Sequence, residues 1–169
     1  MKNYPRIYSL STLGLIHHYE NDYLFHNMRT DFVGDSGSGK SIIADLLQLI
    51  FVGSEMFESA TWTMDEKREL DGLVLRTPHK GIDIGYAFLN IEIQSRHYIV
   101  IGCYLESNSK RTKPFIIQGS SDPRANLLPI SQPLQTKDFK REGNICPLDD
   151  LLDQMEEKGL FLSYWETVK

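Results

Sequence analysis

The sequence predicts an α/β protein with a single domain, in which a glycine-rich loop and a helix precede an antiparallel β-meander. After the stretch "GDSGSGKS" at residues 34–41, apolar residues recur at three- and four-residue spacing, which is typical of a helix. Further along the chain, short turns separate runs in which apolar and polar residues alternate, which is typical of antiparallel strands. The 169 residues, 41% of them apolar, suffice for one hydrophobic core and are too few for two.

The composition excludes several classes of protein. Charged residues make up 24% of the chain and the net charge is −5, so no overall basic field attracts nucleic acid and any DNA contact would be local. Cys103 and Cys146 form neither a disulfide framework nor a metal-ligand spacing, so we expect reduced thiols. The N-terminus does not resemble a signal peptide, and no apolar run approaches the roughly 20 residues of a membrane-spanning helix. We therefore expect a cytoplasmic protein that makes no membrane contact.

Three short strands are expected at the start of the chain, where apolar and aromatic residues cluster between polar turns. They cover residues 6–16, 22–28 and 29–33, with a turn at residues 17–21. The third strand would lead directly into the glycine-rich loop. Arg29 and Asp31 share one face of it, and we expect an ordinary ion pair between them, with a catalytic role for Asp31 as the alternative.

The periodicity changes after Gly39, where a helix with one buried face is predicted. Its apolar stripe consists of Ile42, Ile43, Leu46, Leu47 and Ile50. Leu49 and Phe51 widen this stripe, so we expect the helix to be covered on more than one side. Gly53 is the expected residue at its C-terminal end.

The middle of the chain is predicted to be a meander. Its four strands cover residues 72–77, 82–94, 97–107 and 113–119. The turns between the later strands have hairpin length, which favours antiparallel pairing over a βαβ unit. A proline-rich excursion follows, and then a helix is predicted within residues 146–159, with Pro147 in its first turn and Gly159 at its end.

Residues 34–41 fit the pattern G-x-x-x-x-G-K-[ST], in which each residue type has a physical task. The glycines allow consecutive N–H groups to turn inward around phosphate oxygens. Lys40 supplies a charge for the β- and γ-phosphates, the Ser41 hydroxyl is a ligand for Mg²⁺, and the helix adds its positive N-terminal end. The residues expected to contact the nucleotide are Gly34, Asp35, Ser36, Gly37, Ser38, Gly39, Lys40, Ser41 and Ile42. The alternative is a glycine-rich turn that precedes a helix by chance.

The sequence lacks the second half of a hydrolytic site. Hydrolysis needs an acidic residue at the end of a buried apolar strand, which holds Mg²⁺ and orients water. The segment "PLDD" at residues 147–150 begins a helix, and "IDIG" at residues 82–85 has too short an apolar lead. There is also no guanine-reading N-K-x-D motif and no L-S-G-G signature. We therefore expect nucleotide binding, and nucleotide hydrolysis only when another half completes the site.

The order of phosphate loop, helix and meander resembles the N-terminal lobe of an ABC-type ATPase head of the structural-maintenance-of-chromosomes (SMC) class. The loop "GDSGSGKS" is similar to the pattern G-[DE]-[NS]-G-[AS]-G-K-S of such heads. Blocks such as "GYAFLNIEI", "HYIVIGCYLES" and "KPFIIQG" resemble the MukB-like and Wadjet-type branch, and the resemblance covers residues 6–119. Ile42 departs from it, because many such heads have Thr or Ser there.

The resemblance implies a P-loop NTPase fold in which residues 1–169 form one domain, the N-terminal half of a head. Residues 1–53 would hold the first strands, the loop and its helix, residues 54–119 the meander, and residues 120–169 the proline-rich excursion and the last helix. It also implies ATP and Mg²⁺ as cofactors, a second head in a homodimer, accessory subunits, and DNA handling in segregation, repair or defence against foreign DNA.

The resemblance also gives roles to residues outside the loop. In "FIIQG" it implies that Gln118 senses Mg²⁺ and the γ-phosphate, although the separation from Lys40 is shorter than in typical SMC heads. An ordinary glutamine at a strand end is the alternative. It further places residues 17–19 near the base, where His18 or Tyr19 would stack on adenine, whereas the adjacent histidines by themselves indicate a structural or surface role rather than a metal site.

Two further features have a simple and a functional interpretation. Lys110, Arg111 and Lys113 are expected to lie in a solvated turn, with contacts to a DNA backbone as the alternative. Arg68 is a phosphate- or DNA-sensing arginine only by analogy. Two other functions remain open, a self-contained small P-loop kinase and a non-catalytic interaction module that depends on nucleotide.

Overall fold

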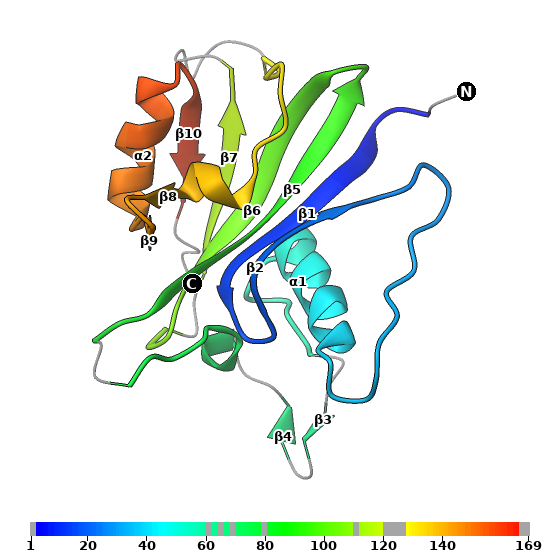
Figure 1. The fold of residues 1–169 in the computed structure, drawn as a ribbon, viewed down its shortest axis with the longest axis vertical. Helices are drawn as coiled ribbons and strands as arrows, with labels where there is room; N and C mark the ends of the chain where they lie inside the picture. Colours follow the sequence, from blue (N-terminus) through cyan, green and yellow to red (C-terminus); the bar gives the residue numbers. More distant parts are fainter. Residues whose placement is uncertain are drawn as a thin grey trace.

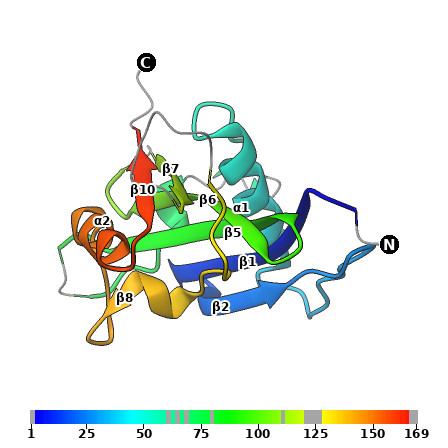
Figure 2. The same cartoon turned by 90° about the horizontal axis from the view of Figure 1, so that it is seen from above.

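A computed structural model describes residues 3–59, 62–63, 66–67, 70–78, 81–109, 112–119 and 128–165. Its centre is a six-stranded antiparallel sheet with the strand order β10-β7-β6-β5-β1-β2. The helix α1 (Lys40–Val52) covers one face of this sheet, and α2 (Leu148–Glu157) lies on the other face (Figures 1 and 2). The prediction of an α/β protein with an antiparallel meander is therefore confirmed.

The strands of the large sheet are β1 (Arg6–Leu15), β2 (His18–Leu24), β5 (Ile84–Gln94), β6 (His97–Glu106), β7 (Lys113–Gln118) and β10 (Phe161–Tyr164). The smaller elements are β3 (Trp62–Thr63), β4 (Glu66–Lys67), β8 (Lys140–Arg141), β9 (Asn144–Ile145) and the 3-10 helices η1 (Leu70–Leu73) and η2 (Thr136–Phe139). The predicted strands at residues 82–94, 97–107 and 113–119 correspond to β5, β6 and β7. The sequence did not predict β10, which pairs with β7 at the edge of the sheet.

The first hairpin turns earlier than the sequence predicts. Leu15 pairs with His18, so only Ile16 and His17 form the turn, and His17 has a φ of 62°. The predicted turn at residues 17–21 is wrong because the residues from His18 onward find pairing partners along β1.

The face to which side chains point changes within β1 at Gly14. Leu13 is buried in the cluster that includes α2, whereas Leu15 is buried in the cluster that includes α1. Regular alternation would place both leucines on one face. Gly14 has a φ of 73°, which interrupts the alternation, and a Cβ there would overlap the Ile84 carbonyl oxygen. The end of β1 and the β1–β2 turn thereby face α1.

Two predicted strands do not form. Residues 29–33 have no neighbouring strand among the described residues, and an extended segment without a partner is not a stable strand. Met28, which precedes this segment, and Val33, at its end, are each 93% exposed. The predicted strand at residues 72–77 is also absent from the described structure. Its first residues belong to η1, and Val74 forms one isolated β-bridge with Leu15.

Helix α1 has the predicted extent. It begins after Gly39, and the N–H of Gly53 at its C-terminal end donates to the carbonyl of Leu49. The side chains of Ile42, Leu46 and Leu49 are buried against Leu15, Ala87, Cys103 and Leu105. The expectation that Phe51 is covered is wrong in this structure, because its side chain is 57% exposed.

The opposite face of the sheet has an aromatic core. Phe88 of β5 stacks on Phe139 of η2 at a centroid distance of 4.1 Å, and Tyr86 contacts the same ring edge-on. The Tyr86 hydroxyl donates to the carbonyl of Cys146 at 2.6 Å. Helix α2 adds Leu148, Leu151 and Met155 to this core. Pro147 precedes the helix as its N-cap instead of lying in the first turn, and Gly159 follows the end with a φ of 72°.

Both cysteines are free, as expected, and the structure shows in addition that both are buried. Burial raises the pKa of the Cys103 thiol to about 12. Among the described residues, neither helix has the length and apolar character that crossing a membrane requires.

Candidate functional site

The glycine-rich loop lies at the start of α1, beside the β1–β2 turn. Gly37 and Gly39 have φ angles of 83° and 88°, which side chains of L-residues disfavour. The Ser38 N–H donates to the carbonyl of Asp35 at 3.1 Å, so the loop closes on itself. The two glycines are therefore required by the shape of the loop, as the motif predicts.

The Lys40 side chain folds back over this loop. Its ammonium group donates to the carbonyl oxygens of Gly34 and Asp35, the latter at 2.7 Å, and to the Ser38 hydroxyl at 3.3 Å. Lys40 and the loop residues before Gly39 are exposed, so an anion can reach the ammonium from solvent. The ammonium thus lies where the motif requires a charge.

The N-terminus of α1 remains open for a ligand. No described side chain caps it, and its first turn contains no acidic residue. The first N–H groups of a helix have no partners within the helix, and together they carry a partial positive charge. Ser41 is exposed beside them. Asp45, one turn further along, is buried and accepts a hydrogen bond from the Ser59 hydroxyl at 2.7 Å, so this carboxylate does not line the loop.

His18 contacts the loop through a hydrogen bond of its buried ring, whereas the resemblance implies stacking on adenine for His18 or Tyr19. Its Nε2 atom lies 2.8 Å from the carbonyl oxygen of Gly39, and its Nδ1 atom lies 2.7 Å from the Tyr23 hydroxyl. Only 6% of its surface is exposed. A Cβ at Gly39 would lie 2.7 Å from the Cβ of His17, so the approach of the hairpin also requires a glycine at this position. The structural role expected for the adjacent histidines is thus found at His18.

Tyr19 does not lie against the loop. Its half-exposed side chain lines a cavity of about 220 Å³ together with Asp83 and Ile145, and no residue of the glycine-rich loop lines that cavity. Its position does not support the expectation that Tyr19 stacks on a base near the phosphates.

Gln118 lies at the other end of the sheet from the loop. Its neighbour Ile117 in β7 pairs with Val100 in β6, and Val100 pairs with Asn90 in β5. Asn90 in turn pairs with Ser9, near the start of β1, so Gln118 lies level with the start of that strand. The loop instead contacts the β1–β2 turn, where β1 ends. The Gln118 side chain is buried, and its Oε1 atom accepts a hydrogen bond from the Leu128 N–H at 3.3 Å. The structure does not bring Gln118 to the phosphate loop, and this geometry favours the ordinary strand-end glutamine.

The remaining predicted residues lie apart from the loop or outside the described residues. Arg29 and Asp31 form an exposed ion pair at 2.9 Å, which confirms the ordinary interpretation. The Lys113 ammonium lies 6.0 Å from the centroid of the Tyr164 ring. Arg68, Lys110 and Arg111 lie outside the residues that the structure describes.

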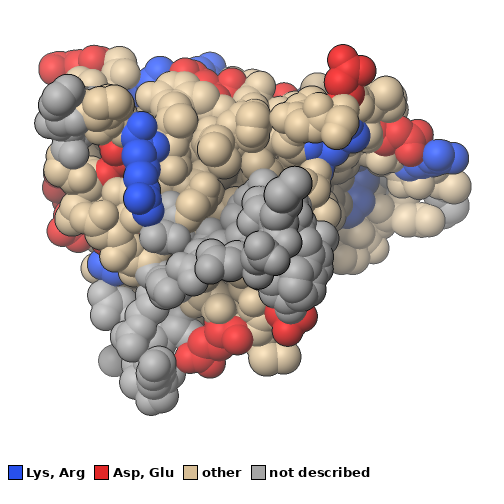
Figure 3. Space-filling view, turned by 90° about the horizontal axis from the view of Figure 1, so that it is seen from below, with Lys and Arg blue, Asp and Glu red and all other residues tan. Residues whose placement is uncertain are grey.

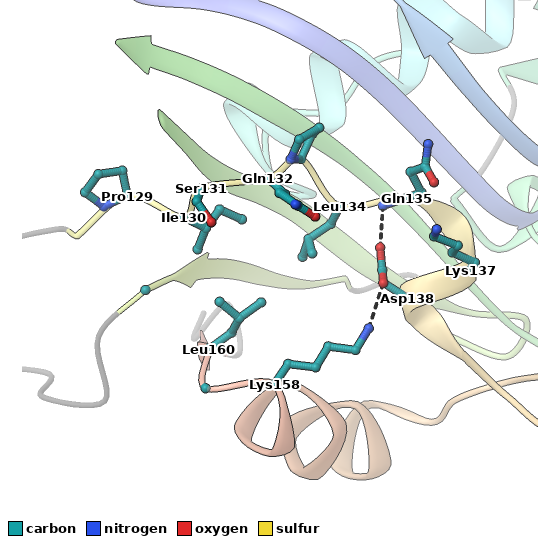
Figure 4. A pocket seen from close by; sticks show the side chains of 13 residues that line it. Pro129, Ile130, Ser131, Gln132, Leu134, Gln135, Lys137, Asp138, Lys158 and Leu160 are labelled. Carbon is teal, nitrogen blue, oxygen red and sulfur yellow. Dashed lines mark hydrogen bonds and ion pairs between the residues drawn. The ribbon is translucent and has the colours of Figure 1, made fainter. Parts of the chain in front are cut away.

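A larger cavity, of about 640 Å³, lies between the segment around residues 129–135, η2 and the end of α2 (Figure 4). Lys158 donates to Asp138 at 2.7 Å, and the second oxygen of Asp138 accepts from the Gln135 N–H at 2.8 Å. The charges of Lys158 and Asp138 neutralise each other. The residues that line the cavity therefore do not form an arrangement of acid, base and nucleophile. No motif in the sequence predicted a cavity here.

The chain matches no protein-family model and no curated protein sequence. Its chemistry therefore follows from the geometry of the site alone. An ammonium, an open helix N-terminus and an exposed hydroxyl gather at one loop, an arrangement that is typical of anion-binding sites. Within the described residues, no cluster of His, Cys, Asp and Glu could hold a metal ion by itself.

Proposed function

We propose that this chain is the ATP-binding half of an SMC-like ATPase head, with a P-loop NTPase site at residues 34–41. The observation that carries this proposal is the Lys40 ammonium, held over a loop with two left-handed glycines at the uncapped start of α1. A triphosphate would take the ammonium from the loop carbonyls and accept hydrogen bonds from the first N–H groups of α1. The Ser41 hydroxyl would be the one ligand for Mg²⁺ that this loop supplies.

Exposed apolar side chains before and after α1 support the idea of a half. Met28 and Val33, in the segment that leads to the loop, are each 93% exposed, and Phe51, Val52 and Met56, at and after the C-terminal end of α1, are between 47% and 71% exposed. Exposed apolar surface of this kind is available to a partner. A second half could pair with residues 29–33 and cover the outer side of α1, where the described residues provide no partner strand. That second half would also supply the acidic residue that hydrolysis needs.

In the assembled protein, two completed heads would bind ATP between them, and ATP hydrolysis would release them in a cycle that handles DNA. On the face shown in Figure 3, Lys and Arg side chains lie scattered among acidic and uncharged residues. Among the described residues of this face, the distribution does not form the basic stripe that typifies a DNA-binding surface. We therefore assign DNA contact to the completed assembly.

A non-catalytic interaction module is the alternative that the same geometry supports, because it needs nucleotide binding and no acidic residue. A small kinase would in addition need a site for a phosphate acceptor beside the loop. The two described cavities are lined by other parts of the chain.

Nucleotide binding and turnover by the purified chain test the proposal together. We expect calorimetry to detect binding of Mg²⁺-ATP, and we expect neither ATP hydrolysis nor phosphotransfer to small acceptors. The Lys40→Ala variant should lose most of the affinity, whereas the exposed Lys137→Ala variant should bind as the original chain does. Phosphotransfer by the chain alone would contradict the half-head and favour the kinase, and absence of binding would contradict the site.

A further inference from the structure

The β1–β2 hairpin is joined to the phosphate loop by a hydrogen-bonded chain of three groups. The Tyr23 hydroxyl lies 2.7 Å from Nδ1 of His18, and Nε2 of His18 lies 2.8 Å from the carbonyl oxygen of Gly39. The two rings also pack edge-on, with a centroid distance of 5.8 Å. His18 and Tyr23 belong to one strand, whereas Gly39 is the N-cap of α1.

The carbonyl oxygen of Gly39 determines which atom donates in each of these two hydrogen bonds. A carbonyl oxygen only accepts, so Nε2 of His18 carries the hydrogen and donates it to Gly39. In the neutral ring Nδ1 then accepts the hydrogen of the Tyr23 hydroxyl. Burial raises the pKa of Tyr23, so the phenol keeps the proton that it donates.

The peptide that His18 contacts is the first peptide of α1. The Gly39 carbonyl also accepts the N–H of Ile42 at 3.0 Å, so both lone pairs of the oxygen are engaged. In a trans peptide the carbonyl and the following N–H point in opposite directions. Holding the Gly39 carbonyl therefore fixes the direction of the Lys40 N–H, which is one of the open donors at the start of α1.

We propose that His18 and Tyr23 are positioning residues that hold the phosphate loop in its binding shape from the neighbouring hairpin. Gly39 has no side chain with which to cap α1. Because glycine can adopt many backbone conformations, contacts with other residues are needed to hold Gly39 at its φ of 88°. His18 supplies that contact, and Tyr23 fixes its ring. This inference rests on the proposed nucleotide site, and it makes the affinity of that site depend on a strand that touches no phosphate.

Substitutions at His18 and Tyr23 test this role. His18→Leu removes both hydrogen bonds, whereas the amide N–H of His18→Gln can replace the donor at Nε2. We expect His18→Leu and Tyr23→Phe to weaken the binding of Mg²⁺-ATP about two- to tenfold, the range that one hydrogen bond provides. We expect His18→Gln to restore most of the loss, which a role in packing alone would not predict.

The matched control is His97→Leu. Its imidazole also contacts a carbonyl oxygen, that of Ser95 at 2.7 Å, but in the β5–β6 hairpin at the other end of the sheet. This variant should bind nucleotide as the original chain does. Thermal unfolding of each variant by circular dichroism shows which of them are folded at the temperature of the binding measurement.

The amide resonance of Lys40 in the ¹H–¹⁵N spectrum, recorded without nucleotide, separates this inference from the proposed function. We expect the resonance to shift in His18→Leu and Tyr23→Phe, and to stay near its original position in His18→Gln and His97→Leu.

If the original chain binds ATP and all four variants bind it equally, the positioning role is wrong and the nucleotide site stands. If the original chain binds no ATP, the proposed function is wrong, and the Lys40 resonance still decides whether His18 holds this peptide. If His18→Leu does not fold, the comparison of Tyr23→Phe with the original chain decides.

Discussion

Asp45 of α1 and Ser59, in the segment that follows the helix, are both buried and joined by a hydrogen bond of 2.7 Å. The carboxylate lies one turn beyond Ser41, within the helix that begins at the phosphate loop. This contact ties the chain after α1 to the helix.

Replacing Ser59 should therefore destabilise the protein. We expect Ser59→Ala to lower the free energy of unfolding by about 1–3 kcal/mol, because a buried carboxylate loses one donor. Urea unfolding followed by circular dichroism measures the change. The exposed Ser36→Ala is the control, and equal stability of the two variants would contradict the importance of the buried contact.

The two left-handed glycines of the loop should differ in their response to a side chain. A Cβ at Gly37 meets no atom within 4 Å, whereas a Cβ at Gly39 lies 2.7 Å from the Cβ of His17 and 2.9 Å from Nε2 of His18. We expect Gly37→Ala to cost about 1–2 kcal/mol through its φ alone. Gly39→Ala should cost clearly more and also weaken ATP binding more strongly. Thermal unfolding and calorimetry of the pair measure both effects, and a reversed order would contradict the loop geometry.

Phe139 should contribute strongly to the stability of the core between the sheet and α2. Its ring is fully buried and stacks on Phe88 at 4.1 Å. We expect Phe139→Ala to lower the free energy of unfolding by about 3–5 kcal/mol, the usual cost of deleting a buried aromatic ring. Denaturant unfolding measures this loss, and the neighbouring exposed Lys137→Ala should leave stability almost unchanged.

The buried thiol and phenols make stability sensitive to alkaline pH. Burial raises the pKa of Cys103 from its ordinary value of 9.0 to about 12, and burial also raises the pKa of Tyr86 and Tyr104. A group whose pKa is raised by folding contributes stability below its unfolded pKa, and this contribution is lost as the pH rises. The free energy of unfolding should therefore fall between about pH 9 and pH 12.

A thiol reagent provides a direct check on the same burial. At pH 8 the reagent should not modify Cys103 in the folded protein, whereas addition of denaturant should make it react at once, because the thiolate is the reactive form. Rapid modification of Cys103 without unfolding would show that the core around α1 opens more readily than the structure indicates.

Local patterns predicted those elements whose buried side chains repeat regularly along the sequence. Alternation identified β5 and β6, and apolar spacing with Gly53 identified α1, because side chains buried on one face show the period of the element. The motif likewise predicted the loop, since two of its glycines adopt angles that other residues disfavour.

Long-range contacts decided the features that the sequence did not predict. The segment at residues 29–33 has the composition of a strand but no neighbouring strand in the part of the chain that the structure describes. In contrast, β10 is a strand because β7 is available beside it. The contact of His18 with the loop depends on Gly14, which turns the end of β1 toward α1. Gln118 fits a motif in sequence, yet the register of four strands places it at the far end of the sheet from the loop.

The pairing of β1 with β5 has a consequence for biosynthesis. The ion pair between Arg6 and Glu92 spans 86 positions of the chain, and both the loop and α1 lie inside this span. The apolar side of α1 packs on residues of β5 and β6, so it has no surface to cover while those strands are still within the ribosome. Although "GDSGSGKS" is synthesised before the meander, the nascent chain should fix the position of this loop only after the meander has emerged from the exit tunnel.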